Sequence, residues 1–307
     1  MQKFDLGLAY VWEYDDDFIF LLEDRLHRRN ISTYRINNDN FYDAKKLLNQ
    51  KKISFSFYLD RAWDVDEEFE ELGKYLKKRR TRIFNPYKKV LHAIDKASMH
   101  LEFITTGINV PYSIIIPPHS EVEEIFVSVE ELSILGRPFI IKPCNTTGGG
   151  LGVVTGAETL KDVLEERLTN TDDKYILQEK IQPVYLEVKR EWFRCYWAFG
   201  KPIIVWWDDQ THLYEVLTNE DIKRFKLNEL SRITKKIANL IQLDFFSTEI
   251  AITENRKFVV IDYVNDQCDM RLKSKHLDGV PDSVAEKIID NLGDLIIKEK
   301  KLQKHKA

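Results

Sequence analysis

The chain has 307 residues, and its 46 lysines and arginines nearly balance its 50 aspartates and glutamates, which leaves a net charge of −4. Hydrophobic residues make up 43% and charged residues 31%, a composition typical of a globular protein and not of a disordered, collagen-like or coiled-coil chain. The near-neutral charge argues against a dedicated DNA-binding protein, and no apolar run approaches the roughly 20 residues of a membrane-spanning helix.

Cysteine usage and the start of the chain indicate a reducing compartment. Cys144, Cys195 and Cys268 are odd in number and show no CxxC spacing, which is typical of free thiols and not of a disulfide framework. The first residues, MQKFDLGLAYVWEYDDD, place acids directly after a short apolar stretch and lack the regions of a signal peptide. We therefore expect a cytoplasmic protein.

The first part of the chain alternates between apolar runs and segments with helical spacing. Two short apolar runs predict buried strands at Phe4–Val11 and Ile53–Leu59. Helical spacing predicts helices at Asp15–Asn30, Ala44–Leu48 and Glu67–Arg80. This order is typical of an open, Rossmann-like α/β layer, which Asn85-Pro86 would end.

The next part predicts two helices and two strands. A helix over Ile94–Thr106 would end at Gly107, because glycine is common just after a helix. Ser128 and Glu131 form a capping-box pattern at the start of a short helix. The predicted strands lie at Tyr112–Ile116 and Phe139–Lys142.

The remaining residues predict a mixture of strands and helices. Strands are predicted at Tyr175–Glu179, Trp192–Phe199, Ile203–Trp207, Phe245–Ile252 and Phe258–Val264. Helices are predicted at Glu158–Leu168, Glu229–Ile241 and Ser283–Lys298. The whole pattern predicts an α/β (α+β) protein whose first unit covers residues 1–86.

A cluster of glycines follows the strand that ends at Lys142. Four of the 12 glycines lie within five positions, at Gly148, Gly149, Gly150 and Gly152. Glycine lets backbone N–H groups point into a concavity, as a phosphate cradle requires. The loop lacks the Lys-Ser/Thr of a Walker A motif, Thr155 replaces the last glycine of a dinucleotide motif, and Lys142 precedes the loop, unlike the kinase lysine. A lysine that ends a buried strand needs an anion, which favours a phosphate loop over the alternative of a flexible hairpin turn.

The segment from Arg137 to Val154, RPFIIKPCNTTGGGLGVV, resembles the phosphate loop of the ATP-grasp superfamily. That superfamily includes glutathione synthetase, D-alanine–D-alanine ligase and the ribosomal-protein glutamate ligases. The motifs around the loop occur in the family's order, namely Asn85-Pro86, Asp95-Lys96, Gly107-Ile-Asn-Val-Pro111, Leu177-Gln178-Glu179 and Trp192-Phe193-Arg194. The resemblance implies an ATP-grasp fold in three parts. These are an N-terminal α/β domain over residues 1–86, a central domain over residues 87–175 carrying the loop, and a C-terminal domain over residues 176–307 carrying a metal site.

The resemblance further implies ATP as a cofactor and a set of residues that bind it. The residues implied near the phosphates are Lys96, Lys142, Thr147, Gly148, Gly149 and Gly150. Those of the adenine hinge are Gln178, Glu179, Lys180 and Ile181, with Glu187 on the ribose. Arg194 and Lys142 are the expected catalytic residues. Taken alone, Lys96 could be a solvated charge, Arg194 a cross-strand partner and Glu187 a surface acid.

The resemblance also implies Mg²⁺ or Mn²⁺, because hard cations prefer oxygen ligands. The implied ligands are Glu249, Asp262 and Asn265. The family has an acid two residues before the asparagine, whereas this chain has Tyr263 there and its acid three residues before. Either the strand is bulged or the ligand set differs, with Asp266 and Asp269 as nearby substitutes. In the alternative interpretation, Glu249 and Asp262 are edge-strand acids that face water.

Trp206 and Trp207 are neighbours on a predicted strand, so their side chains face opposite sides of the sheet. One is expected in the core, and the other lies either in the core or beside a substrate pocket.

The activity that the resemblance implies is that of a carboxylate–amine or carboxylate–thiol ligase. A substrate carboxylate would take the γ-phosphate of ATP, and the resulting acyl phosphate would react with the amine or thiol. We expect small-molecule or peptide substrates and no nucleic-acid or membrane partner, while a homo-oligomer stays open. The alternatives are a small-molecule kinase and an ATP-binding module without turnover, the latter suggested by the irregular Asp262–Asn265 segment.

Overall fold

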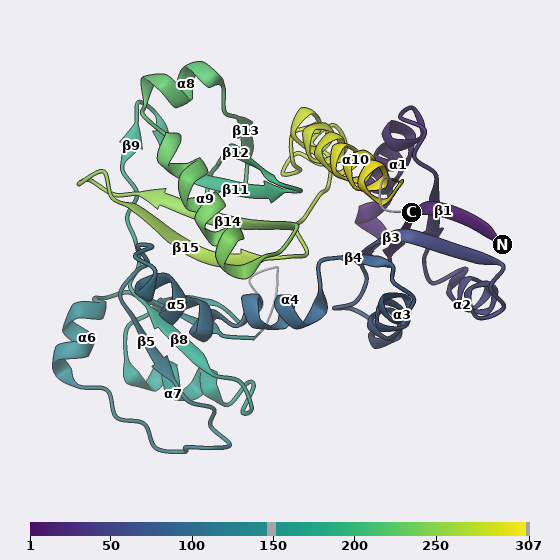
Figure 1. The fold of residues 1–307 in the computed structure, drawn as a ribbon. Coiled ribbons are helices and arrows are strands. Elements are labelled where there is room, and N and C mark those ends of the chain that lie inside the picture. The colour runs from purple at the N-terminus through teal and green to yellow at the C-terminus, as the bar shows by residue number, and fades with distance from the viewer. Residues whose placement is uncertain (146–151, 305–307) are drawn as a thin grey trace.

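The computed structural model describes residues 1–145 and 152–304, which form layers of helices and sheets (Figure 1). Across these two ranges, no helix combines the length and the apolar character that crossing a membrane demands. The predicted glycine loop falls mostly outside the described residues.

The first layer is a parallel sheet with the strand order β2-β1-β3-β4, which confirms the predicted α/β unit. Its strands are β1 (Gln2–Tyr10), β2 (Thr33–Ile36), β3 (Ile53–Arg61) and β4 (Arg82–Phe84). Its helical elements are η1 (Glu13–Asp15), α1 (Asp16–His27), α2 (Phe41–Asn49) and α3 (Glu67–Lys78). The helices pack through apolar side chains three or four residues apart, such as Phe69, Leu72 and Leu76 of α3, because that spacing lines one helix face.

The helix predicted over Ile94–Thr106 is confirmed as α5 (Lys96–Thr105), which begins slightly later. The helix before it, α4 (Tyr87–Ile94), was not predicted, and Asp95 lies between the two helices in an extended conformation. The carboxylate of Asp95 accepts a hydrogen bond from the backbone N–H of Ser98 at 3.0 Å and so caps the start of α5. Gly107 follows α5 with φ 70°, as its role after a helix end requires.

The second sheet is antiparallel and has the order β5-β8-β6-β7. Its strands are β5 (Ser113–Ile116), β6 (Phe139–Pro143), β7 (Val154–Ala157) and β8 (Tyr175–Gln178). The helices beside it are α6 (Val129–Leu135) and α7 (Leu160–Arg167). The predicted capping box is confirmed, because the side chains of Ser128 and Glu131 each accept a hydrogen bond from the other's backbone N–H.

The third sheet is antiparallel and has the order β13-β12-β11-β14-β15. Its strands are β11 (Trp192–Ala198), β12 (Lys201–Trp207), β13 (Tyr214–Val216), β14 (Phe245–Ile252) and β15 (Phe258–Asn265). The elements next to it are the hairpin β9 (Tyr185–Leu186) and β10 (Lys189–Arg190) and the helices α8 (Asn219–Arg224) and α9 (Asn228–Ile241). The apolar face of α9 packs on β11 and β12 and makes a core there.

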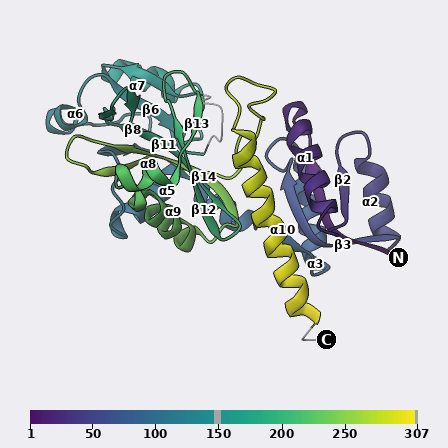
Figure 2. The ribbon, with the colours of Figure 1, turned by 90° about the horizontal axis from the view of Figure 1, so that it is seen from above.

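The last helix, α10 (Asp282–Lys304), returns to the first layer and runs along its boundary with the rest of the chain (Figure 2). It packs against α1, and one apolar core includes residues of both helices, of β1 and of β12. Arg25 of α1 donates hydrogen bonds to the Asp290 carboxylate at 2.8 and 3.3 Å. The two ends of the described chain are thus joined in one layer.

Candidate active site

A bulge in β14–β15 brings two predicted metal ligands together. The two strands pair with Ile250 opposite Val260. Continued by one pair, this register would place Ile261 opposite Glu249, but irregularities on both sides of Glu249 place Asp262 there instead. Residues directly opposite each other in an antiparallel pair project from the same face. Of the two alternatives left open by the sequence, the bulge is therefore present, and it compensates for the shifted position of the acid.

Glu249 is buried, with 8% of its surface exposed, and is held by β11. Arg194 lies directly opposite it, and their charged groups approach to 2.7 Å. The indole Nε1 of Trp192 donates to the other carboxylate oxygen at 3.0 Å. Burial raises the pKa of Glu249, while the Arg194 guanidinium opposes that rise. Glu249 is therefore a paired acid inside the sheet and not an edge-strand acid facing water.

Arg194 is itself enclosed by an aromatic side chain. Its guanidinium lies 4.5 Å from the ring centroid of Trp207, close enough for a cation–π interaction. Burial lowers its pKa, but the carboxylates of Glu249 and Asp262 and two nearby tyrosines together outweigh burial and raise the pKa, so the arginine stays charged. The tryptophan pair divides as expected, because Trp206 is buried in the core and Trp207 is half-buried over Arg194.

Lys142 approaches this acid pair from the second sheet. It lies on β6 with 8% exposure, and its Nζ donates to the backbone carbonyl of Ile261 at 3.2 Å. Burial lowers the pKa of Lys142, the carboxylates of Asp262 and Glu249 oppose that change, and the nearby Lys96 ammonium adds to it. The structure thus brings the charges of five predicted site residues close together in one charged group. They are Lys96 of α5, Lys142 of β6, Arg194 of β11, Glu249 of β14 and Asp262 of β15.

Tyr263 lies on the other face of β15 from Asp262, because neighbours on a strand alternate in direction. Only 2% of its surface is exposed, and its hydroxyl is 2.6 Å from Nδ1 of His100. Gln178, at the end of β8, donates its amide to the same hydroxyl at 3.3 Å. Burial raises the pKa of Tyr263, which keeps the phenol neutral. Tyr263 is therefore a core residue, and its place in the motif tells nothing about the metal ligands.

The other residues predicted to bind the nucleotide differ in burial and in their partners. Glu179 accepts a hydrogen bond from the backbone N–H of Tyr112 at 3.1 Å, Lys180 is exposed, and Ile181 packs beside the apolar cluster that includes Trp192. Glu187 is exposed in the β9–β10 turn, where it pairs with Arg224 of α8 and not with the charged group. The residues Thr147, Gly148, Gly149 and Gly150 lie outside the described residues.

The side chains present fit a hard divalent cation in their chemistry. Glu249 and Asp262 face each other, and Asn265 at the end of β15 would add an amide oxygen. The described parts of the chain contain no group of three or more His, Cys, Asp or Glu side chains placed to hold a metal. The third protein ligand of the predicted set would accordingly be the amide.

A second group of acids lies where the end of β3 meets the segment after β15; the sequence pointed to Asp266 only as a substitute metal ligand and did not single out Asp60. We call Asp60, Trp63, Asp266 and Gln267 the β3–β15 junction. Trp63 Nε1 donates to the Asp266 carboxylate at 3.2 Å, and the Gln267 amide bridges that carboxylate and the backbone carbonyl of Asp60, both at 3.2 Å. Burial raises the pKa of Asp60 to about 6 and that of Asp266 to about 7. The available sequence signals were the charges directly after the apolar run Ile53–Leu59 and the acid directly after Asn265.

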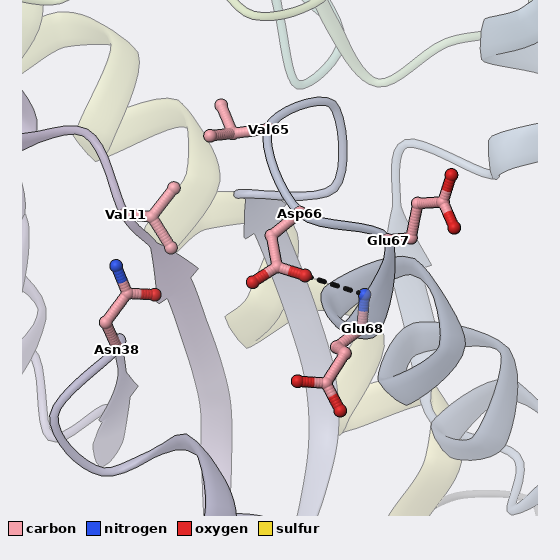
Figure 3. Close-up of a pocket in the computed structure, with 6 residues that line it drawn as sticks. All are labelled: Val11, Asn38, Val65, Asp66, Glu67 and Glu68. Atoms are coloured by element: carbon pink, nitrogen blue, oxygen red, sulfur yellow. Dashed lines mark hydrogen bonds between the residues drawn. The ribbon is translucent and has the colours of Figure 1, made fainter.

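A pocket of about 460 Å³ opens at the carboxyl ends of the parallel strands of the first layer (Figure 3). Its lining includes Val11 after β1, Asn38 after β2 and the segment from Val65 to Glu68 after β3. Asp66 accepts a hydrogen bond from the backbone N–H of Glu68 and caps α3, as Figure 3 shows. Open α/β sheets commonly bind ligands at this edge, where the strand order reverses, here between β1 and β3.

No protein-family model matches the sequence, and no curated protein matches it. Solved structures do match. One is D-alanine–D-alanine ligase from Bacillus anthracis complexed with ATP, with a TM-score of 0.62 and 16% identity over 98% of this chain and 99% of that chain. Another is a RimK domain ATP-grasp protein from Sphaerobacter thermophilus, with a TM-score of 0.62 and 17% identity over 94% of this chain and 98% of that chain. A third is the ATP-grasp ligase PsnB complexed with minimal precursor, Mg and ADP, with a TM-score of 0.57 and 12% identity over 93% and 97%. The chain therefore has the ATP-grasp fold, as the resemblance in its sequence predicted.

Proposed function

We propose that the protein is an ATP-dependent ligase that joins a substrate carboxylate to an amine or thiol through an acyl phosphate. The observation that carries the proposal is the charged group of Lys142, Arg194, Glu249 and Asp262, which different elements hold together inside an ATP-grasp fold. The similar solved structures named ATP-grasp ligases support the same reaction class.

The proposed reaction is a phosphoryl transfer followed by an acyl transfer. A carboxylate oxygen attacks the γ-phosphorus of ATP, the bond from that phosphorus to the β,γ-bridging oxygen breaks, and ADP leaves. The amine or thiol then attacks the acyl carbon and loses its proton, and inorganic phosphate departs. Neither step needs a nucleophile from the protein, so this chain would act by positioning and by neutralising charge.

The side chains divide this work by their charge. Lys142 and Lys96 would hold the phosphates, and Arg194 would stabilise the transferring group through its planar guanidinium. Glu249, Asp262 and Asn265 would hold Mg²⁺ or Mn²⁺, which supplies further neutralisation of the triphosphate. Gln178, Glu179, Lys180 and Ile181 would border the adenine, and the loop Gly148–Gly152 would cover the phosphates.

The first test measures the thermal stabilisation of the protein by Mg-ATP. Lys142→Ala should remove most of the shift, because the lysine would neutralise the bound phosphates. Lys161→Ala is the matched control, since Lys161 is an exposed lysine that contacts Glu165 on the surface of α7. Equal shifts in Lys142→Ala and the parent would place the nucleotide elsewhere.

The second test separates turnover from binding through the metal ligands. Asp262→Asn should abolish ADP release while the Mg-ATP shift falls less, because the γ-phosphate loses its position before the adenine loses its contacts. ADP release is measured with pools of carboxylates with amines, with alcohols, and without added substrate. Release that requires alcohols would favour a kinase, and nucleotide binding without any release would favour a module without turnover. Parental activity in Asp262→Asn would transfer the ligand role to Asp266 or Asp269.

A further inference from the structure

A second pocket, of about 330 Å³, opens at the amino ends of the parallel strands, on the edge of the first sheet opposite to the pocket of Figure 3. It lies where the ends of α2 and α3 meet the start of β3, and we call it the α2–α3 groove. The apolar part of its lining includes Leu48, Phe55 and Leu76. The charged part consists of three successive cations, Lys78, Arg79 and Arg80. The volume lies within the range of roughly 300–1,000 Å³ that is typical of small-molecule pockets.

The three cations of the groove are exposed, and two more stand beside it. Lys51 and Lys52 are exposed in the turn between α2 and β3. Within residues 1–145 and 152–304, none of these five side chains forms an ion pair, because the acids of α3 pair with other lysines, Lys45 and Lys74. Like charges gathered around a concave surface raise the local concentration of the opposite charge. The groove therefore favours an anion.

Hydrogen bonds hold the sides of the groove in place. The hydroxyl of Tyr75 donates to the backbone carbonyl of Leu48 at 3.3 Å and ties α3 to α2. The guanidinium of Arg79 lies 4.6 Å from the ring centroid of Tyr75, which is within the range of a cation–π interaction. Thr81 Oγ1 donates to the backbone carbonyl of Phe55 at 3.0 Å and ties the turn after α3 to β3. The groove and one of its cations are thus in position before a ligand binds.

Ser54 of β3 adds a hydroxyl to the lining of the groove. The residue is half-buried, and its Oγ is buried without a hydrogen-bond partner in the part of the chain that the structure describes. A hydroxyl can turn to donate to an acceptor that arrives beside it. An anion in the groove would supply that acceptor.

The groove is separate from the proposed nucleotide site. Ser54 and Asp60 lie near opposite ends of β3, a strand of 9 residues, and hence roughly 20 Å apart. It is the Asp60 end of this strand that meets Gln267 after β15. A ligand in the groove would therefore not contact Lys142 or Arg194, and its binding can be measured independently of ATP.

We propose that the α2–α3 groove binds a small phosphate monoester with an apolar or aromatic body. The body would occupy the apolar part of the groove, and the phosphate oxygens would accept hydrogen bonds from Lys78, Arg79 and Arg80 and from the Ser54 hydroxyl. A phosphate monoester carries close to two negative charges at neutral pH, and several adjacent cations favour it over a carboxylate with one charge. The inference goes beyond the proposed ligase function and does not depend on it.

The experiment uses the full chain and phenyl phosphate as the probe. Three matched compounds are phenol, which lacks the phosphate, benzoate, which carries one charge, and inorganic phosphate, which lacks the apolar body. Binding is measured by calorimetry and by thermal shift, each with and without Mg-ATP. We expect saturable binding of phenyl phosphate under both conditions, weaker binding of benzoate and of inorganic phosphate, and no binding of phenol.

Arg80→Gly is the most informative variant, because folding should not suffer from it. Arg80 has a left-handed backbone with φ 68°, which glycine adopts without strain, so the variant should be at least as stable as the parent. It should raise the half-saturating concentration of phenyl phosphate about threefold to tenfold, since one charged hydrogen bond is lost. Lys226→Gly is the matched control, because Lys226 is an exposed lysine with φ 55° after α8, outside the groove, and its binding should equal that of the parent.

Two further variants locate the phosphate. Lys78→Gln combined with Arg79→Gln removes two charges of the groove and should raise the half-saturating concentration about tenfold or more. Lys142→Ala should bind phenyl phosphate as the parent does, because Lys142 belongs to the proposed nucleotide site.

Several results would overturn the inference. They are the absence of phenyl phosphate binding, equal binding of phenol or of inorganic phosphate, parental half-saturation in Arg80→Gly, and loss of binding in Lys142→Ala with retention in Arg80→Gly. A single-stranded oligonucleotide or vesicles of phosphatidic acid that bind while phenyl phosphate does not would also overturn it, in favour of a nucleic acid or a membrane surface.

Discussion

Glu249 in β14 and Asp266 directly after β15 are buried to a similar degree but have different surroundings. Glu249 pairs with Arg194 and lies close to Lys142, so protein cations surround it. Asp266 accepts hydrogen bonds from an indole and an amide, and its nearest charged influence is another carboxylate. Burial raises the pKa of both carboxyl groups, so burial alone does not separate them.

The difference shows which buried charges are already balanced by other protein groups before a ligand binds. The charges of Arg194 and Glu249 balance each other within the sheet, so removing only one of the two should lower the stability of the protein. The β3–β15 junction holds carboxyl groups at a cost to folding, and such a cost persists in proteins mostly where function requires it. Measurements of the unfolding free energy at several pH values can therefore distinguish the two regions.

The largest expected effect comes from breaking the pair. Arg194→Met leaves Glu249 as an unpaired buried charge and should lower the free energy of unfolding by about 3–5 kcal/mol. Chemical denaturation of the metal-free protein measures this. The matched control is the double variant Arg194→Met with Glu249→Gln, which should recover most of the loss because no charge is stranded. A double variant as unstable as the single one would show that the arginine acts through packing on Trp207.

The second effect concerns pH at the junction. The pKa of Asp60 is about 6 in the folded protein against 3.8 for a free aspartate, a difference worth about 3 kcal/mol. Between these values the folded state holds a proton that the unfolded state has lost, so stability falls as pH rises through this window and then levels off. Asp60→Asn lacks this fall.

The unfolding free energy of Asp60→Asn, relative to that of the parent, should therefore rise by up to about 3 kcal/mol from pH 4 to pH 7. Denaturation curves at pH 4, 5, 6 and 7 measure it, with the exposed Asp39→Asn as the control. A difference between variant and parent that does not change with pH would refute the assignment.

The smallest effect concerns the opposite face of β15. Tyr263→Phe removes the hydroxyl that contacts His100 and Gln178 and should destabilise the protein by about 1–2 kcal/mol. The Mg-ATP shift and ADP release should stay at the parental level once folding is complete, because Tyr263 faces the core. Loss of ADP release with retained stability would instead place the phenol in the reaction.

Local pattern predicted much of the fold. The strand-like run Phe245–Ile252 predicted β14 with its observed bounds, because apolar residues at both ends of the run suit a buried strand. Ser128 and Glu131 predicted the start of α6, since a capping box acts within one helical turn. Short strands such as β2 and β4 were not predicted, because three or four residues show too little periodicity to distinguish a strand from a loop.

The charged group was predicted only in part. Lys142, Arg194, Glu249 and Asp262 could be named because they stand in motifs whose order is visible in the chain. That Asp262 faces Glu249 follows from a bulge, and register is a property of two paired strands. Asp95 caps the start of α5 and so sets the boundary between α4 and α5, which the pattern had placed at Ile94.

The sequence by itself determined the alternation of strands and helices, the helix caps and the identity of the charged residues, because these depend on interactions within a few positions of the chain. Tertiary structure decided that α10 packs on α1 in the first layer, that Glu249 is paired, and that Asp60 and Asp266 meet at one junction. These depend on contacts between residues far apart in the chain, such as Arg25 with Asp290, which are 265 positions apart, and on the burial that results from them. A local pattern contains no information on which distant partner will share a buried position, and that partner determines whether a buried charge is balanced.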